Sequence, residues 1–155
     1  MSIEVYTDGS LSKNKKNIYC GYGIHFPDSK IYKDISRIFK HSPITNNRAE
    51  LYAIIKTLTI CNIIYKKKKI THLHIKSDSE YCVKTANVWY ASWMKNGKNY
   101  DNKDLIDDMM LLIKNVKFKV TITHTRAHIG NEGNEKADKL AKIGGGNPKY
   151  EYLNV

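Results

Sequence analysis

The chain has 155 residues, which is enough for one domain that buries a core without disulfides or metals. Its 26 Lys and Arg residues outnumber its 15 Asp and Glu residues, and the formal charge of +11 favours a nucleic acid or another anionic surface as partner. No 18-residue apolar run and no signal peptide is present, so we expect a soluble intracellular protein, in the cytoplasm, nucleoid or nucleus, with no membrane partner.

The chain begins with an alternation of apolar and polar residues that is typical of a strand. It predicts a strand over Ile3–Thr7, followed by a polar loop over Ser10–Asn17. Two further strands are expected over Cys20–Pro27 and Lys30–Phe39, joined by a turn at Asp28-Ser29. The three strands would form an antiparallel meander.

A helical period replaces the alternation from Asn47 to Ile64 and predicts a long helix. Its apolar stripe consists of Leu51, Ile54, Ile55 and Leu58. We interpret the basic run Lys66–Lys69 as a solvated connector. The expectation for Glu50 is a place in the first turn of this helix.

The second half of the chain alternates between the two periods. Strands are predicted over Thr71–Lys76 and Phe118–Thr123. Helical segments are predicted over Ser79–Lys84, Trp89–Lys95, Leu105–Ile113 and Asn131–Ile143. A meander followed by alternating helices and strands favours an α/β fold, a mixed sheet flanked by helices. We expect residues 1–146 to form the domain and residues 147–155 to form a loosely ordered tail.

The chain has three cysteines, Cys20, Cys61 and Cys82, which are widely spaced and include no C-x-x-C pair. An odd, scattered set argues against a disulfide framework or a zinc site and favours a reducing compartment. We therefore expect each cysteine to be a small buried apolar residue.

Four short signatures each carry one acid: TDGS with Asp8, TNNRAEL with Glu50, SDSEY with Asp78 and HIGNEGNEKAD with Asp138. Sites in such sheets form where strands end and helices begin, and we expect Asp8 and Asp78 to end adjacent strands. Crowded carboxylates repel one another unless a hard divalent cation neutralises them. The pattern indicates metal-dependent chemistry on a polyanion.

Each acid also has a simpler interpretation. Asp8 could belong to a turn, Glu50 could complement a helix dipole, Asp78 could cap a helix, and Asp138 could lie on a solvated face. These interpretations hold for one residue at a time, whereas the four signatures occur together and in order.

The chain resembles type 1 ribonuclease H, in the form without an accessory hybrid-binding domain. The resemblance covers Ile3 to Lys142 and rests on the four signatures, on Gly21-Tyr22-Gly23, on two tryptophans four apart and on an H-x₉-D spacing. It implies a ribonuclease H-like fold, a five-stranded mixed sheet of order 3-2-1-4-5. It also implies endonucleolytic hydrolysis of the RNA strand of RNA–DNA hybrids with two Mg²⁺ ions, or Mn²⁺ in their place, leaving 5′-phosphate and 3′-hydroxyl ends.

The resemblance assigns catalytic roles to five residues. Asp8 would bridge the two ions, Asp138 would hold the ion that activates water, and Glu50 and Asp78 would hold the ion on the leaving-group side. His128 would aid proton transfer or product release, for which an imidazole titrates in the right range. The family also implies a monomer without an obligate protein partner.

The hybrid-binding positions carry over in the same way. The resemblance places amides in the minor groove, a pocket around a DNA phosphate, and a channel for the DNA strand. The residues are Asn14, Asn46 and Asn47 for the groove, Thr45 and Asn102 for the phosphate, and Trp89 and Trp93 for the channel. Core packing is the alternative for the two tryptophans.

At two places the sequence differs from the family's pattern in a way that lowers the expected affinity for the hybrid. Pro43 stands where a basic residue often precedes the Thr45 position, and the segment between Trp93 and Asn102 is shorter than the family's basic protrusion. We therefore expect turnover to be retained, with low and strongly salt-dependent affinity for the hybrid.

Three other functions remain open at this point. They are another nuclease of the same superfamily, resembling an integrase, a transposase or a resolvase; a catalytically weak or inactive hybrid-binding module; and a domain processed from a reverse transcriptase. The initiating Met1 favours a free-standing protein.

Overall fold

The computed structural model describes residues 1–126 and 130–153. Its elements in chain order are β1 (Ser2–Asn14), β2 (Asn17–His25), β3 (Ile35–Ile38), α1 (Asn46–Tyr65), β4 (His72–Ser77), α2 (Glu80–Lys84), the π-helical turn η1 (Thr85–Trp89), α3 (Tyr90–Asn96), α4 (Lys103–Asn115), β5 (Lys119–His124), α5 (Glu132–Gly144) and the 3₁₀ turn η2 (Pro148–Tyr150). No helix in these described ranges is both long and apolar enough to cross a membrane.

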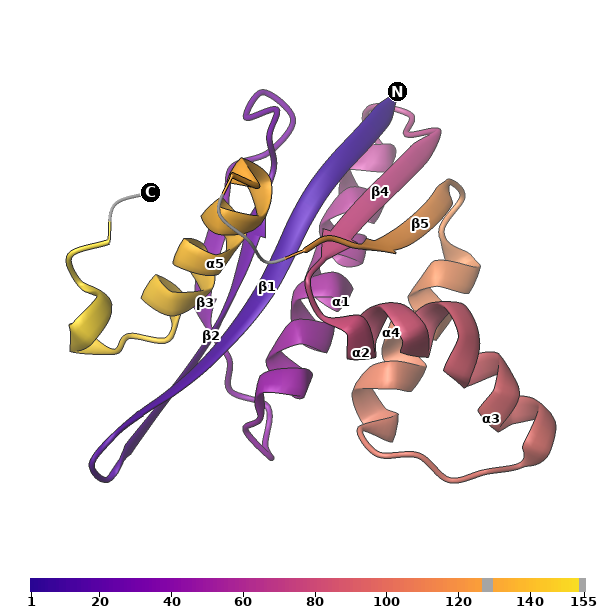
Figure 1. Ribbon diagram of the computed structural model, residues 1–155. Helices are drawn as coiled ribbons and strands as arrows, with labels where there is room; N and C mark the ends of the chain where they lie inside the picture. Colours follow the sequence, from indigo (N-terminus) through magenta and orange to yellow (C-terminus); the bar gives the residue numbers. More distant parts are fainter. Residues whose placement is uncertain (127–129, 154–155) are drawn as a thin grey trace.

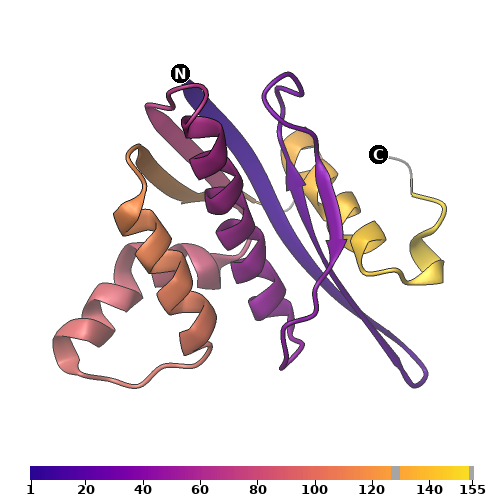
Figure 2. The same ribbon diagram turned by 180° about the vertical axis from the view of Figure 1, so that it is seen from behind.

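The five strands form one mixed sheet in the order β3-β2-β1-β4-β5, which confirms the expected topology. β1, β2 and β3 pair antiparallel, and β4 and β5 continue the sheet parallel to β1. α1 covers one face of the sheet and α5 covers the other (Figures 1 and 2). The fold is therefore an α/β sandwich of helix, sheet and helix.

The expected loop over Ser10–Asn17 is wrong, because β1 runs on to Asn14 and pairs with β2 in a long hairpin. Its register continues from Gly9 opposite Tyr22 to Asn14 opposite Asn17, and Lys15 turns the chain with a φ of 52°. The hairpin extends beyond the helices (Figure 1), so the side chains at its tip are exposed, and apart from Ile18 they are polar. Backbone pairing is the main interaction between these strands, and no apolar alternation reveals them.

The predicted strand Lys30–Phe39 is also too long. The strand that pairs with β2 is Ile35–Ile38, and the Phe39 N–H adds a bond to the Cys20 carbonyl at 2.8 Å. The residues before the strand form a turn in which the Ile31 N–H donates to the Asp28 carbonyl at 3.0 Å. Asp34 fixes this turn, because its carboxylate accepts from the Phe26 N–H and contacts His25 Nδ1 at 2.9 Å.

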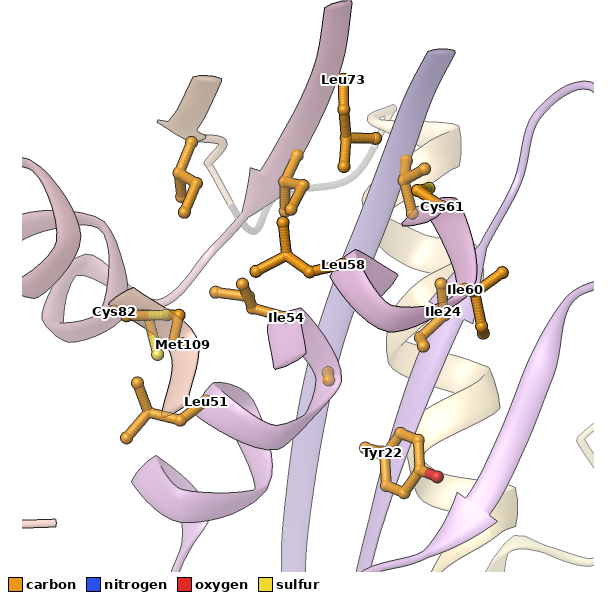
Figure 3. Packing of buried hydrophobic residues seen from close by; sticks show 14 of the residues in the cluster. Tyr22, Ile24, Leu51, Ile54, Leu58, Ile60, Cys61, Leu73, Cys82 and Met109 are labelled. Atoms are coloured by element: carbon orange, nitrogen blue, oxygen red, sulfur yellow. The ribbon is translucent and has the colours of Figure 1, made fainter. Parts of the chain in front are cut away.

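The core lies between the sheet and α1 and extends to α2 and α4, as Figure 3 shows. Leu51, Ile54 and Leu58 of the predicted stripe are fully buried. α1 also buries residues outside that stripe, because α4 packs on it as well as the sheet. Cys20, Cys61 and Cys82 are buried free thiols, as expected from their spacing.

The helical segments after β4 are more continuous than the sequence indicates. α2, η1 and α3 follow one another without a gap from Glu80 to Asn96, and the expected break follows at Gly97, which adopts a left-handed φ of 61°. The single π-helical turn carries Trp89 at its end. Such turns are rare and often mark functional positions.

The segment predicted to be a tail, residues 147–155, begins with a buried residue. Asn147 donates its side-chain amide to the Ser12 hydroxyl of the hairpin at 2.9 Å, and the 3₁₀ turn η2 follows. The division into residues 1–146 and a loosely ordered tail over 147–155 stays a prediction.

Gly23 offers a direct test of how α5 packs on the sheet. A Cβ at this position would lie 2.5 Å from the Ala137 carbonyl oxygen and 2.6 Å from the Ala141 nitrogen, both in the backbone of α5. We predict that Gly23→Ala lowers the free energy of unfolding by about 2 kcal/mol or more and the Tm by roughly 4–8 °C in a calorimetric melt. Gly97→Ala is the control, because its methyl meets nothing within 4 Å and only the backbone conformation opposes it, at about 1 kcal/mol. Equal costs for the two variants would contradict this packing.

Candidate active site

The site forms in a notch where β4 ends beside β1. Their parallel pairing stops at Thr7 and Ser77, whereas β1 continues along β2. Beyond the last pair, the Gly9 N–H donates to the Glu50 carboxylate and to Asp8 Oδ1. The expectation that Asp8 ends the first strand is therefore wrong: Asp8 lies within β1, and it is the neighbouring β4 that ends.

Glu50 reaches this notch because α1 lies directly on the backbone of Gly9. A Cβ at Gly9 would be 2.7 Å from the Glu50 nitrogen, so glycine permits the close approach. Thr45 caps α1 and no acid lies in its first turn, so the expected first-turn position of Glu50 is wrong: Glu50 is the residue that directly follows the first turn. This placement also weakens the alternative in which Glu50 complements the helix dipole, since that effect fades after the first turn.

Asp78 and Asp138 come from the segments on either side. Asp78 follows β4 directly, and the cap of α2 is Ser79, whose hydroxyl accepts from the Cys82 N–H at 3.2 Å. Asp78 is therefore not needed as a helix cap. Asp138 lies on α5 and forms an ion pair with Lys142 at 2.9 Å.

The acids converge as the sequence predicts. Asp8, Glu50 and Asp78 each offer a carboxylate oxygen within 4.8 Å of those of the other two. Asp8 and Glu50 are 5% and 4% exposed, and Asp78 is half-buried. Asp138 lies outside this close trio and lines the same hollow of about 420 Å³. We call this space the acid hollow.

Burial makes the trio costly to ionise. Burial, and after it the charge of Glu50, raises the pKa of Asp8, with smaller contributions from Asp78 and Asp138. Burial also raises the pKa of Glu50, against the hydrogen bonds that its carboxylate accepts from Asp8 and Gly9. The pKa of Asp78 is raised, again mainly by burial. Protons or cations must therefore neutralise part of the charge in this hollow.

A second hollow of about 490 Å³ lies beside the first. Its lining consists of Pro43, Thr45, Asn47, Arg48, Asp101, Asn102 and Asp104. Thr45 and Asn102 meet here as predicted, and Asn47 lines both hollows. Asn102 adopts a left-handed φ of 60° and donates its amide to the Tyr81 hydroxyl at 3.0 Å.

Arg48 is a residue of this site to which the sequence gave no role. It is 2% exposed and donates to both carboxylate oxygens of Asp104, at 2.8 and 2.7 Å, and to the carbonyls of His41 and Ser42. Asp104 is distant in sequence, so no local pattern could reveal the pair. Because Asp104 neutralises the guanidinium, the second hollow has little positive charge to offer a phosphate.

Aromatic rings extend from the acid hollow toward α3. Tyr81 lines that hollow and lies edge-on to Trp89 at 6.3 Å, and Trp93 follows at 6.2 Å from Trp89. Trp93 stacks on Tyr100 with centroids 4.8 Å apart and a 9° tilt. Trp89 remains 36% exposed, whereas Trp93 is packed against the core, so the core-packing alternative applies to Trp93.

The remaining predicted residues divide into three cases. Asn46 lies in the acid hollow together with Asn47. Asn14 lies near the exposed tip of the hairpin, about 20 Å along β1 from Asp8. His128 lies outside the described residues.

Known proteins are similar to this chain in sequence and in fold. The sequence model of the RNase H family matches residues 1–145. The ribonuclease H of Francisella philomiragia subsp. philomiragia is 38% identical over 146 residues, which are 90% of this chain and 88% of that protein.

Solved structures show the same arrangement. The RNase H1 from the halophilic archaeon Halobacterium salinarum NRC-1 superposes with a TM-score of 0.59 at 20% identity, over 93% of this chain and 97% of that one. LC11-RNase H1, isolated from compost and solved in complex with an RNA/DNA hybrid, gives a TM-score of 0.68 at 21% identity, over 93% and 96%. At these identities the structures show the fold, and the sequence matches show the relationship. The chain belongs to the ribonuclease H family.

Proposed function

We propose that this protein cuts the RNA strand of RNA–DNA hybrids internally and leaves 5′-phosphate and 3′-hydroxyl ends. The observation that carries the proposal is the convergence of buried carboxylates from β1, α1 and the end of β4, with Asp138 of α5 lining the same hollow. A relative at 38% identity bears the name ribonuclease H, and a protein of the same fold was solved with a hybrid.

The acid hollow fits hard divalent cations. Its close trio offers only carboxylate oxygens, and burial together with mutual repulsion opposes their ionisation without a counter-charge. Asp8, Glu50, Asp78 and Asp138 would hold two Mg²⁺ ions, or Mn²⁺ in their place. Bound there, the ions would supply an activated water and stabilise charge on the phosphate and the leaving oxygen.

The amides beside the acids suit recognition of the RNA strand. Asn46 and Asn47 begin α1 and line the acid hollow, so their side chains are available next to the reacting phosphate. The 2′-hydroxyl distinguishes RNA from DNA and both donates and accepts hydrogen bonds, as an amide does. These two residues would fix the ribose strand over the carboxylates. Asn14, about 20 Å along β1, would contact a more distant nucleotide.

The DNA strand would follow the aromatic side of the site. Trp89 presents an exposed ring near Tyr81, against which a deoxyribose without a 2′-hydroxyl can pack. Thr45 and Asn102 would contact a DNA phosphate in the second hollow. The Arg48–Asp104 pair and Pro43 make this contact weak, so hybrid affinity should be low. The affinity that remains should depend strongly on salt, because the net charge of +11 attracts phosphates over the surface as a whole.

His128 keeps the role that the resemblance suggests. It would move a proton between the attacking water or the leaving oxygen and solvent, because imidazoles in general titrate near neutrality. The protein would act as a monomer on the hybrid without a protein partner.

A cleavage panel tests the substrate class. Labelled RNA–DNA hybrid, duplex DNA, duplex RNA and a four-way junction would each be incubated with Mg²⁺, with Mn²⁺ or with EDTA. We expect cleavage of the hybrid only, in the RNA strand only, and only with a metal. Cleavage of junctions or duplex DNA would instead favour a resolvase-like nuclease, and metal-dependent binding without cleavage would favour a hybrid-binding module.

Asp78→Asn tests the acid hollow. We predict that kcat falls roughly 1,000-fold while the Kd for the hybrid changes little, because the carboxylate contributes transition-state stabilisation of several kcal/mol through the ions. Single-turnover cleavage of labelled RNA and fluorescence anisotropy give the two values. Glu80→Gln is the matched control: Glu80 lines the same hollow, but it is exposed and paired with Lys84. Wild-type cleavage by Asp78→Asn would remove this residue from the mechanism.

Asp8→Asn tests the charge repulsion. The pKa of Asp8 is raised from 3.8 in the folded protein, so stability is lost as the pH rises from that value toward the raised one. In EDTA at about pH 8, we predict a Tm roughly 3–6 °C above wild type, from about 1–2 kcal/mol of relieved repulsion. The gain should vanish at about pH 3, where the wild-type carboxyl is protonated, and should shrink with Mg²⁺. A lower Tm for Asp8→Asn in EDTA would contradict the repulsion.

Trp89→Ala and Trp93→Ala separate binding from packing. We predict that Trp89→Ala raises KM for the hybrid roughly 10-fold with little change in Tm, because its exposed ring contacts the substrate. Trp93→Ala should lower the Tm as well, since its ring stacks on Tyr100. Steady-state kinetics and thermal melts of both variants, with Trp89→Phe as the conservative control, measure these effects. Unchanged KM in Trp89→Ala would exclude the proposed DNA channel.

A further inference from the structure

Two stretches of the chain without acidic residues meet at the end of the molecule opposite the acid hollow. No Asp or Glu occurs between Leu51 and Ser77, or between Met109 and Asn131. The fold joins them where α1 ends, β4 begins and α4 leads into β5 (Figures 1 and 2). The Lys119 N–H donates to the Thr71 carbonyl at 3.1 Å, and the rings of Tyr65 and Phe118 lie 5.8 Å apart.

This end of the molecule carries a cluster of exposed lysines, which we call the distal lysine patch. Its members are Lys66, Lys67, Lys68, Lys69, Lys114, Lys117 and Lys119. Within the described ranges, none of them forms an ion pair with an acid, in contrast to Lys76, Lys84, Lys103 and Lys142. The patch is therefore a concentrated positive charge that the protein itself leaves uncompensated.

Helix dipoles do not account for this charge. α1 and α4 both end here, and each helix C-terminus carries a partial charge of about −0.5, about −1 in total. The lysines of the patch exceed that by about six charges. The Lys67 and Lys68 N–H groups already bond to the Ile64 carbonyl at the end of α1, a backbone role that any residue type fulfils.

The patch is too far from the acid hollow to belong to the same contact. At a rise of about 1.5 Å per residue, Lys66 lies about 24 Å from Glu50 along α1. A short hybrid over the acids would not reach it, whereas a longer nucleic acid could touch both places.

We propose that the distal lysine patch is a second nucleic-acid-binding surface, which grips the phosphate backbone of a segment outside the cleaved stretch without reading its sequence. Lysines are point charges on flexible stems, so they fit regularly spaced phosphates and carry no base specificity. Binding at two places on one nucleic acid raises the local concentration of the second contact. The patch thereby offsets the weak phosphate grip beside Arg48 on long substrates.

The test compares two variants with the same loss of charge. The patch variant is Lys66→Gln/Lys67→Gln/Lys68→Gln/Lys69→Gln. The control variant is Lys30→Gln/Lys33→Gln/Arg37→Gln/Lys56→Gln, whose basic side chains line a hollow between α1 and β3. Thermal melts establish that both variants fold.

Binding to duplex DNA of about 30 base pairs is measured in EDTA by fluorescence anisotropy over a range of salt, so that its outcome does not depend on cleavage. We expect the patch variant to bind roughly 10-fold more weakly, with a log Kd versus log salt slope smaller by about 2–3, and the control variant to bind as wild type does. If both variants bound equally weakly, the lysines of the patch would act only through the net charge of the protein, and the proposal would be overturned.

A second arm uses hybrid length. A hybrid of about 10 base pairs extends about 17 Å to each side of its centre, short of the patch, whereas one of about 30 base pairs is long enough to reach it. KM should rise roughly 10-fold for the long hybrid and stay unchanged for the short one in the patch variant. A rise on both lengths would place the lysines in the active-site contact and overturn the proposal.

A third arm tests a membrane as the ligand instead. Vesicles of phosphatidylcholine and phosphatidylserine would be sedimented with wild type and with both variants. We expect little retention of any of them, since the lysines occupy the connections between core elements and the amphipathic helix that ends here, α4, already packs its apolar face against α1. Retention that only the patch variant loses, with duplex binding unchanged, would assign the surface to anionic lipid.

Discussion

Repulsion among carboxylates held out of water is the constraint on which this structure depends. Asp8 and Glu50 are almost fully buried, and Asp78 lies within 4.8 Å of both. No packing advantage explains acids in such a place, because each ionised group loses hydration and opposes the others. The fold concentrates this unfavourable interaction at the acid hollow. Cations that bind there would relieve the repulsion, and an anionic substrate could then bind to the cations.

The scaffold creates the notch with simple devices. β4 ends early beside a longer β1, and Gly9 lets α1 approach until Glu50 reaches the freed backbone N–H. On the other face, Gly23 brings α5 against the strands, which places Asp138 beside the same hollow. Glycines and a strand end therefore gather acids that are far apart in sequence.

Periodicity predicted a mixed sheet flanked by helices, the family resemblance predicted the order of its strands, and the ordered signatures predicted the gathering of the acids. The sequence-based predictions were wrong or silent for features that no local sequence pattern indicates. The outer hairpin is held mainly by backbone pairing between mostly polar residues, so its sequence predicts a loop. The buried Arg48 pairs with the exposed Asp104 of a distant segment, and the stacking of Trp93 on Tyr100 depends on how the chain turns at Gly97. Tertiary packing determines the length of the hairpin, the ion pairs and the ring contacts. The hydrophobic periodicity of the sequence carries no information about such contacts.

Charge is divided unevenly over the molecule: acids gather at one end of α1 and unpaired lysines at the other. The central claim, that the buried acids form a cation site, is tested most directly by anomalous diffraction from crystals soaked with Mn²⁺. The account predicts anomalous peaks among the carboxylates of Asp8, Glu50, Asp78 and Asp138. Peaks only elsewhere, with the acid hollow empty at saturating Mn²⁺, would contradict it.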